Sequence, residues 1–297
     1  MDTNSPKAGL PRLLIMGCGD VGMRILTFLR SSRQPRFRIY AVTSQTSRCA
    51  ALRAAGAIPI VANLDEPATL VRLSGLANLI LYLAPPPSYG RLDTRSRHLA
   101  AILPHHSRLA YVSTTGIYGD CGGALFDETR TPTPQNPRAV RRLDAEQVWR
   151  DWGQRSQSCV TILRVPGIYA ADRLPLERLK NATPALCPED DVMTNHIHAD
   201  DLARLVLQVL WRGQPNRIYH AVDNSDMAMG AYFDLVADAT GLPRPPRLSR
   251  VDLAGQVSPM MLSFMSESRR MSNHRITHEL GVRLRYPTVK DGLLGVN

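Results

Sequence analysis

Long apolar runs are missing from this sequence, and none approaches the ~20 residues that a membrane-spanning helix needs. The first ten residues also lack the apolar core of a secretory signal, and we expect residues 1–10 to form a flexible polar tail. The five cysteines are scattered, and no two of them form a Cys-x-x-Cys pair. This pattern predicts a reducing compartment and no metal site. We therefore expect a cytoplasmic protein with no membrane partner.

Lysine is almost absent, because only Lys7, Lys180 and Lys290 occur in a chain with a formal net charge of +10. The positive charge is carried by arginines, which are dispersed and are not interleaved with aromatic residues. Net charge by itself indicates only non-specific attraction to polyanions. We therefore predict no nucleic-acid partner and expect a small-molecule substrate instead.

The most informative motif is Gly-Cys-Gly-Asp-Val-Gly at residues 17–22, a Gly-x-Gly-x-x-Gly pattern. It follows an apolar run and opens a segment with helical periodicity, which is the context that gives the pattern meaning. The first glycine permits a tight turn, the second lets backbone amides approach a pyrophosphate, and the third lets helix and strand pack closely. The positive end of the helix dipole favours phosphates at the same place. The residues predicted to bind a dinucleotide here are Gly17, Gly19, Asp20, Val21 and Gly22.

Apolar strand candidates alternate with helical segments through the first half of the chain. The predicted strands are Leu13–Met16, Arg38–Val42, Pro59–Val61, Leu79–Leu83, Leu109–Ser113 and Val160–Arg164. The predicted helices between them are Val21–Leu29, Arg48–Ala55, Pro67–Leu73, Ser96–Leu103 and Arg138–Trp152. This alternation predicts an α/β fold with a doubly wound, Rossmann-type parallel sheet, whose ligands lie beyond the carboxyl ends of the strands.

The alternation weakens after about residue 170, where proline and charged residues become frequent. We predict an NAD(P)-binding Rossmann domain over residues 11–170, with a returning segment near residues 199–224. Residues 171–297 are predicted to form a smaller, mostly C-terminal, substrate-binding lobe.

The end of the second predicted strand decides between the two nicotinamide cofactors. An NAD-binding protein usually places Asp or Glu there to hold the ribose hydroxyls. Residues 43–48 contain no acid and offer hydroxyl groups together with Arg48. Ser44 and Arg48 suit a 2′-phosphate, so NADP is favoured over NAD. The alternative is a solvated loop in an arginine-rich protein, which leaves NAD open.

Several ordered landmarks resemble the extended and atypical short-chain dehydrogenase/reductase family, the NAD-dependent epimerase/dehydratase-like proteins. The clearest is Tyr-Val-Ser-Thr-Thr-Gly-Ile-Tyr-Gly-Asp at residues 111–120, and two others lie at residues 163–169 and 198–203. The resemblance implies an oxidoreductase or an epimerase/dehydratase-type enzyme acting on a small polar metabolite. It places Asn63 and Leu64 near the adenine, and Ala84 and Pro85 near the nicotinamide ribose. It also implies a homodimer formed through the helix Arg138–Trp152.

The sequence departs from the family at its catalytic Tyr-x-x-x-Lys. Aligned on Glu146, the tyrosine position is Arg138 and the lysine position is Arg142. Arg142 could hold the ribose, whereas the Arg138 guanidinium has no neutral form near pH 7 and cannot replace a phenol. The predicted catalytic set is therefore Thr114, Tyr118, Arg138 and Arg142. Thr114 would polarise the substrate, and Tyr118 or a water molecule would deliver the proton.

Each of these assignments has a structural alternative. The Thr114 hydroxyl could simply cap a strand end, with Ser113 as the neighbour that a shift of one residue would substitute. Tyr118 and Tyr169 could be packed rings. Arg138 and Arg142 could form either an anion pocket or a solvated helix face. For the whole protein, the alternative is a non-catalytic NADP-binding sensor or scaffold.

Overall fold

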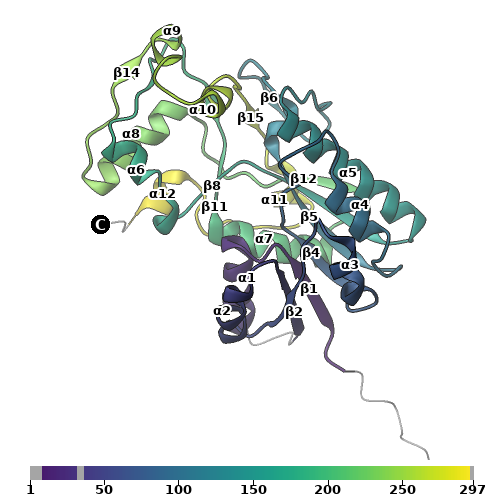
Figure 1. Ribbon diagram of the computed structural model, residues 1–297. Helices are drawn as coiled ribbons and strands as arrows, with labels where there is room; N and C mark the ends of the chain where they lie inside the picture. The colour runs from purple at the N-terminus through teal and green to yellow at the C-terminus, as the bar shows by residue number, and fades with distance from the viewer. Residues whose placement is uncertain (1–8, 32–36, 295–297) are drawn as a thin grey trace, which may run out of the picture. The chain divides into compact units, whose positions relative to one another are not determined.

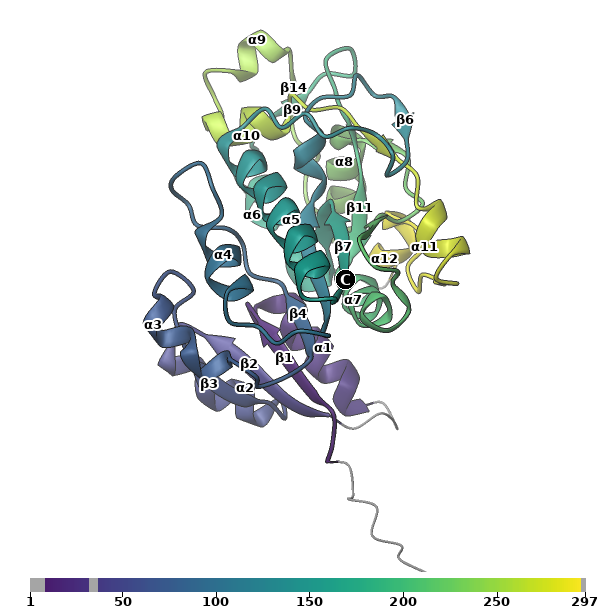
Figure 2. The same cartoon turned by 90° about the vertical axis from the view of Figure 1, so that its right-hand side faces the viewer.

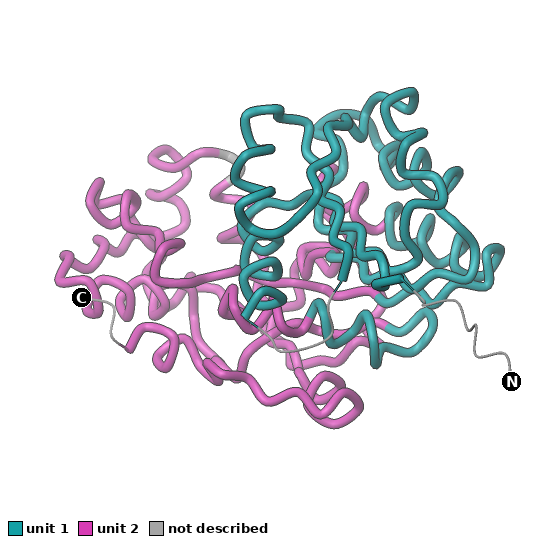
Figure 3. The backbone as a smooth tube through the Cα atoms, turned by 90° about the horizontal axis from the view of Figure 1, so that it is seen from below, with its two compact units in different colours: residues 1–112, 144–161, 206–217 teal, residues 113–143, 162–205, 218–297 magenta. Residues whose placement is uncertain are grey.

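A computed structural model describes residues 9–31 and 37–294 of the chain. Most of the predicted polar tail, residues 1–8, lies outside the described residues, and Leu10 is exposed. By compactness the chain divides into two units, which Figure 3 draws in different colours. Unit 1 consists of residues 1–112, 144–161 and 206–217, and unit 2 of residues 113–143, 162–205 and 218–297.

Seven parallel strands form the main sheet in the order β12-β7-β5-β4-β1-β2-β3. Their bounds are β1 Arg12–Met16, β2 Arg38–Thr43, β3 Ile58–Val61, β4 Leu79–Tyr82, β5 Arg108–Thr114, β7 Cys159–Val165 and β12 Arg217–His220. The interior strand β1 pairs with β2 and β4, and its residues 13–16 are fully buried. An apolar run that is buried on both faces is what a central parallel strand requires. The predicted α/β fold with a Rossmann-type parallel sheet is confirmed.

Helices follow the strands of this sheet. Their bounds are α1 Asp20–Ser31, α2 Cys49–Ala54, α3 Pro67–Leu70, α4 Thr94–Ala100, α5 Pro137–Arg155 and α7 Ala199–Arg212. Short 3₁₀ turns are η1 Thr46–Arg48, η2 Val71–Leu73, η3 Thr115–Tyr118 and η4 Ala171–Arg173. Helices α1 and α2 lie on one face of β1 and β2, and α3 and α4 lie on the other (Figures 1 and 2).

Local sequence explains how two of these helices begin and pack. The Asp93 carboxylate accepts hydrogen bonds from the backbone amides of Arg95 and Ser96, which caps the start of α4. In α5, Trp149 is fully buried and its ring contacts those of Tyr82 and Tyr111 on β4 and β5. These aromatic contacts fix the second half of α5 on the sheet of unit 1.

The remaining elements belong to unit 2. Its short helices and one longer helix are α6 Leu176–Lys180, α8 Met229–Thr240, α9 Arg250–Leu253, α10 Pro259–Phe264, α11 His274–His278 and α12 Val289–Leu293. Its small strands pair as β8 Gly167–Tyr169 with β11 His196–His198, β10 Met193–Thr194 with β13 Met227–Ala228, β9 Ala185–Leu186 with β14 Arg247–Leu248, and β6 Leu125–Phe126 with β15 Arg270–Met271. A core of buried side chains around Tyr169, Phe233 and Val236 holds α6, α8 and α12 together.

The predicted domain boundaries at residues 10 and 170, and the returning segment 199–224, remain a prediction. The two compact units divide the chain elsewhere, because the last residues of β5 and β7 group with unit 2. None of the described helices is both long enough and apolar enough to cross a membrane.

Candidate functional site

A pocket of about 360 Å³ opens in unit 1 at the carboxyl ends of β1, β2, β3 and β4. We call it the glycine-loop pocket. The residues that line it are Gly17, Cys18, Gly19, Val42, Thr43, Ser44, Gln45, Arg48, Ala62, Asn63, Leu64, Leu83, Ala84, Pro85 and Arg95. Ligands of doubly wound sheets bind at this edge.

The glycines of the motif differ in what they do. Gly17 has a φ of +82°, and a Cβ there would lie 2.4 Å from the backbone nitrogen of Ala84. Gly17 therefore serves the fold, because no side chain fits between the two loops. A Cβ on Gly19 would meet no protein atom within 4 Å. The space beside Gly19 is therefore open, next to the start of the 12-residue helix α1.

Arginine supplies the charge of the glycine-loop pocket. Arg95 pairs with Asp65 at 2.6 Å and donates to the carbonyl oxygen of Pro85 at 2.9 Å. The side chain of Arg48 makes no hydrogen bond or ion pair with any residue of the described ranges. Among the described residues that line this pocket, none is acidic. Burial raises the pKa of the Cys18 thiol to about 11, so Cys18 is protonated and is no nucleophile.

Eight of the predicted cofactor residues line this pocket: Gly17, Gly19, Ser44, Arg48, Asn63, Leu64, Ala84 and Pro85. Asp20, Val21 and Gly22 form the first turn of α1 instead, where the Asp20 carboxylate pairs with Arg24. The Asn63 side chain is occupied within its own turn, since it donates to Glu66 and accepts from the backbone amide of Asp65. Arg142 belongs to unit 2, so its contact with a cofactor remains a prediction.

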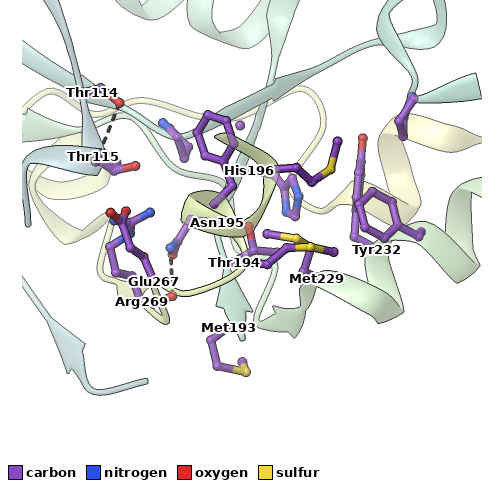
Figure 4. Close-up of a pocket in the computed structure, with 18 of the residues that line it drawn as sticks. Thr114, Thr115, Met193, Thr194, Asn195, His196, Met229, Tyr232, Glu267 and Arg269 are labelled. Atoms are coloured by element: carbon purple, nitrogen blue, oxygen red, sulfur yellow. Dashed lines mark hydrogen bonds and ion pairs between the residues drawn. The ribbon is translucent and has the colours of Figure 1, made fainter. Parts of the chain in front are cut away.

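A second pocket, of about 450 Å³, lies within unit 2, and we call it the lobe pocket. The residues that line it are Thr114, Thr115, Gly116, Arg138, Pro166, Gly167, Pro175, Arg178, Met193, Thr194, Asn195, His196, Met229, Tyr232, Phe233, Met261, Phe264, Met265, Glu267 and Arg269. Thr114, Thr115, Glu267 and Arg269 lie on one side and Met229 and Tyr232 on the other, with His196 between them (Figure 4).

Thr114 stands at the polar side, where β5 ends and η3 begins. Its hydroxyl oxygen accepts a hydrogen bond from the backbone amide of Gly116 at 3.2 Å. The capping role of Thr114 is therefore real. A hydroxyl can donate while it accepts, so the O–H of Thr114 is still able to polarise an oxygen of a ligand.

His196 lines the middle of the lobe pocket and is buried. Its ring stacks on that of Tyr232 with centroids 4.2 Å apart, and its Nδ1 has no hydrogen-bond partner among the described residues. Burial lowers the pKa of His196 to about 4, so the imidazole is neutral near pH 7. Within the described part of the chain, no group of three His, Cys, Asp or Glu side chains could hold a metal ion.

The expectation that Tyr118 faces a substrate is wrong. Tyr118 is fully buried, and its hydroxyl lies 2.6 Å from Nε2 of His220 and 2.5 Å from Nη1 of Arg164. His220 Nδ1 lies 3.1 Å from the carbonyl oxygen of Ser272, so this nitrogen carries the proton and Nε2 accepts from the phenol. Tyr118 is thus a core residue whose hydroxyl makes buried hydrogen bonds within the fold.

The other predicted candidates also differ in their positions. Arg138 lines the lobe pocket as expected of a substrate contact, whereas Arg142 lies on α5 and lines neither of the two pockets. Tyr169 is enclosed and donates to the carbonyl oxygen of Thr288 at 3.0 Å. Ser113 is buried beside Thr114, and its hydroxyl has no hydrogen-bond partner among the described residues.

Replacing Tyr118 with phenylalanine is therefore expected to cost stability rather than turnover. The change leaves Nε2 of His220 and one Arg164 donor buried without their partner, which costs about 1–3 kcal/mol. Urea unfolding of Tyr118→Phe, beside the exposed control Tyr89→Phe, measures this. Wild-type stability combined with lost turnover would instead make Tyr118 the catalytic acid.

Four charged residues of the two pockets were not predicted from the sequence: Arg95, Arg178, Glu267 and Arg269. Glu267 pairs with Arg269 at 2.5 Å, and Asn136 on the other side donates to it at 3.4 Å. These residues come from segments that carry no motif, so only the folded chain identifies them.

Comparison with known proteins matches residues 92–221 to the family model described as the NAD dependent epimerase/dehydratase family. This match confirms the family resemblance seen in the sequence. Among curated proteins, human dTDP-D-glucose 4,6-dehydratase is 26% identical over 143 residues, which cover 44% of this chain and 41% of that enzyme. The match thus spans about two fifths of the relative's own length.

Solved structures resemble the chain over nearly its whole length. A conserved protein of unknown function from Silicibacter pomeroyi is 29% identical with a TM-score of 0.79, and the match covers 96% of this chain and 98% of that one. A dTDP-glucose 4,6-dehydratase from Bacillus anthracis in complex with NAD is 14% identical with a TM-score of 0.76, over 95% and 94% of the two chains. The latter likeness shows the fold alone.

Proposed function

Residues 92–221 carry an NAD dependent epimerase/dehydratase family domain, and from this premise we propose that the chain is an NAD(P)-dependent enzyme. Its reaction would be of the oxidoreductase or epimerase/dehydratase type, on a small polar metabolite. The observation that carries the proposal is the glycine-loop pocket, where Gly17 admits no side chain and Gly19 leaves space open beside the start of α1.

The residues of this pocket fit a dinucleotide. Backbone amides at residues 17–22 would bind the pyrophosphate, since the start of a long helix offers free N–H groups and positive potential. Asn63 and Leu64 would border the adenine, and Ala84 and Pro85 the nicotinamide ribose. When bound, the nicotinamide ring donates or accepts a hydride.

In the lobe pocket, Thr114 would orient the substrate by donating its O–H to a substrate oxygen. Arg138 would bind substrate electrostatically, because a guanidinium cannot transfer a proton near neutral pH. A water molecule would then deliver the proton that the family's tyrosine usually supplies, since the Tyr118 hydroxyl is committed to His220.

We propose NADP rather than NAD as the cofactor, and Arg48 is expected to decide this. A guanidinium that binds a 2′-phosphate contributes about 1.5–3 kcal/mol, so Arg48→Ala should weaken NADPH binding by about 10–100-fold and leave NADH binding unchanged. Titration of the purified protein with each nucleotide, followed by fluorescence, measures this. Arg53→Ala is the matched control, because Arg53 is exposed on α2 and does not line the pocket.

Two outcomes of this titration would contradict the proposal at different levels. Equal loss of NADPH and NADH affinity in Arg48→Ala would mean that Arg48 does not select the 2′-phosphate. Failure of both nucleotides to bind the wild-type protein would overturn the enzyme proposal itself.

A non-catalytic NADP-binding sensor is the second candidate, and it is favoured because Arg138 and Arg142 stand on α5 where the family has its Tyr-x-x-x-Lys pair. The open lobe pocket around Thr114 and Arg138 supports an enzyme instead. The two candidates differ in turnover, because a sensor binds NADPH without transferring its hydride to any carbonyl compound. A carbonyl screen that follows NADPH absorbance, with Thr114→Val as the inactive reference, separates them.

A further inference from the structure

The lobe pocket has more positive than negative charge in its lining. Three guanidinium groups, those of Arg138, Arg178 and Arg269, face one carboxylate, that of Glu267. Glu267 and Arg269 pair directly at 2.5 Å, and Arg269 also donates to the carbonyl oxygen of Gly119. The charges of Arg138 and Arg178 therefore remain without a matching carboxylate in the lining.

Arg178 is the more informative of the two. It is half-buried on α6, and its guanidinium lies over the ring of Phe233 at 4.5 Å. One Nη donates to the carbonyl oxygen of Pro184 and the other contacts the Sδ of Met261, while Nε is buried and has no hydrogen-bond partner in the described part of the chain. Burial lowers the pKa of Arg178, and no carboxylate opposes this effect.

A half-buried cation with unused donors costs folding free energy unless a ligand compensates it. A guanidinium offers five N–H donors, and here only a carbonyl oxygen and a weakly accepting sulfur engage them. An anion is the ligand that would accept hydrogen bonds from the remaining Nη hydrogens and complete the charge balance.

Arg138, an exposed residue, supplies a second cation to the lining of the same pocket. Its guanidinium lies over the ring of Phe264 at 4.5 Å, and burial lowers its pKa although Glu267 opposes this. Stacking on an aromatic face holds a guanidinium in place and leaves its N–H edge free to meet a ligand.

Besides these charges and the polar Thr114, Thr115, Thr194, Asn195 and His196, a large part of the lining is apolar. This apolar wall consists of Met229, Met261, Met265, Phe233 and Phe264, together with Pro166 and Pro175. Thioether and aromatic surfaces offer sugar hydroxyls no hydrogen bonds, and an unpaired hydroxyl is costly to bury. Flexible methionines instead accommodate apolar groups of varied shape.

We propose that the lobe pocket binds an organic anion, a carboxylate or phosphate ester, whose charged group lies on Arg178 or Arg138 and whose apolar body lies against the methionine and phenylalanine wall. The proposal rests on the proposed function in taking this anion as the substrate, and it narrows the polar metabolite to this class. Binding of the anion itself requires only unit 2.

The test is calorimetric titration of the nucleotide-free protein with 3-phenylpropionate, octanoate and phenyl phosphate. The neutral 3-phenylpropan-1-ol, of matched size, reports binding of the apolar body alone. We expect at least one anion to bind at least about 10-fold more tightly than the alcohol, and Arg178→Gln or Arg138→Gln to remove that difference. Arg244→Gln is the matched control, because this exposed arginine of unit 2 pairs with Asp238 and lines neither pocket.

A second readout guards against variants that fail to fold. Because Arg178 lacks a carboxylate partner, Arg178→Gln should unfold at the same temperature as the wild type or higher. The anions should raise the unfolding temperature of the wild type and of Arg244→Gln, but not that of Arg178→Gln. A lower unfolding temperature for Arg178→Gln with unchanged anion affinity would show a structural role and overturn the proposal. Equal binding of the alcohol and the anions, or no binding of any anion at millimolar concentration, would also overturn it.

Failure of this inference can be told from failure of the proposed function. Anion binding without NADPH binding would leave the anion site standing and remove the enzyme proposal. NADPH binding and turnover without anion binding would leave the enzyme proposal standing and remove the anion site.

Discussion

Replacing Gly19 with alanine is expected to abolish tight dinucleotide binding while leaving the unliganded fold intact. A Cβ on Gly19 meets no protein atom within 4 Å, and Gly19 has no positive φ. The new methyl group would therefore stand only where a pyrophosphate should approach the backbone. We expect the unfolding temperature to change by no more than about 2 °C, and NADPH affinity to fall by about 100-fold.

Gly17→Ala is the matched contrast, because it should destabilise the fold itself. Its Cβ would lie 2.4 Å from the Ala84 nitrogen at a φ of +82°, so both the turn and the contact between the loops after β1 and β4 would have to shift. We expect a loss of about 3 kcal/mol or more in the free energy of unfolding. Chemical unfolding and NADPH titration of both variants test this pair. Unchanged NADPH affinity in a folded Gly19→Ala protein would contradict dinucleotide binding at this loop.

Stability is expected to rise with pH between about 4.5 and about 6, because of three buried groups in unit 2. Burial lowers the pKa of His196 to about 4 and that of His220 to about 3. Below pH 6.5 the two histidines therefore bind protons in the unfolded chain but not in the folded chain. This difference lowers stability as the pH falls. Burial raises the pKa of Asp223 to about 7, so between its ordinary pKa of 3.8 and about 7 the folded chain holds one proton that the unfolded chain has lost.

The net difference in bound protons between the unfolded and folded states sets the sign and the size of the change in stability with pH. In that window the unfolded state binds two protons more at the histidines and one fewer at Asp223, a net of one. Stability should therefore rise by about 1.4 kcal/mol per pH unit from these groups, and level off near pH 7.

Asp223→Asn isolates one contribution to this slope. The asparagine cannot ionise, so the slope between about pH 4.5 and about 6 should double, and stability above pH 7 should exceed that of the wild type. Urea unfolding across this range, with the exposed Asp172→Asn as control, measures both effects. An Asp223→Asn profile parallel to that of the wild type would show that Asp223 ionises normally in the folded protein.

The sheet could be predicted from the sequence because its signals are local. The strand predicted at Pro59–Val61 is observed at Ile58–Val61, and the helix predicted at Arg138–Trp152 is observed at Pro137–Arg155. An apolar run between two turn signals identifies a buried parallel strand without knowledge of its neighbours. The small strand pairs of unit 2 are two or three residues long, too short to produce any such pattern.

The site was predictable only where a motif ties geometry to sequence. The glycine motif and the loops after the strands gave eight residues that line one pocket, because strand ends of a parallel sheet meet at one edge. Tyr118 was misassigned because its burial depends on Arg164 and His220, which lie 46 and 102 positions further along the chain. Arg178 was missed because an arginine without a carboxylate partner is recognisable only once its surroundings are known.

The interleaving of the two units has a consequence for how the protein is made. Each unit consists of three separate stretches, and unit 1 is complete only when residues 206–217 have been synthesised. The apolar strands β1 to β4 leave the ribosome before the second half of α5 and the end of α7, which belong to the same unit, have been made. Exposed parallel strands with distant partners are slow to fold and prone to aggregate. Neither unit corresponds to one continuous stretch of the gene, so recombinant production must use the whole chain, and slower synthesis at low temperature should raise the soluble yield.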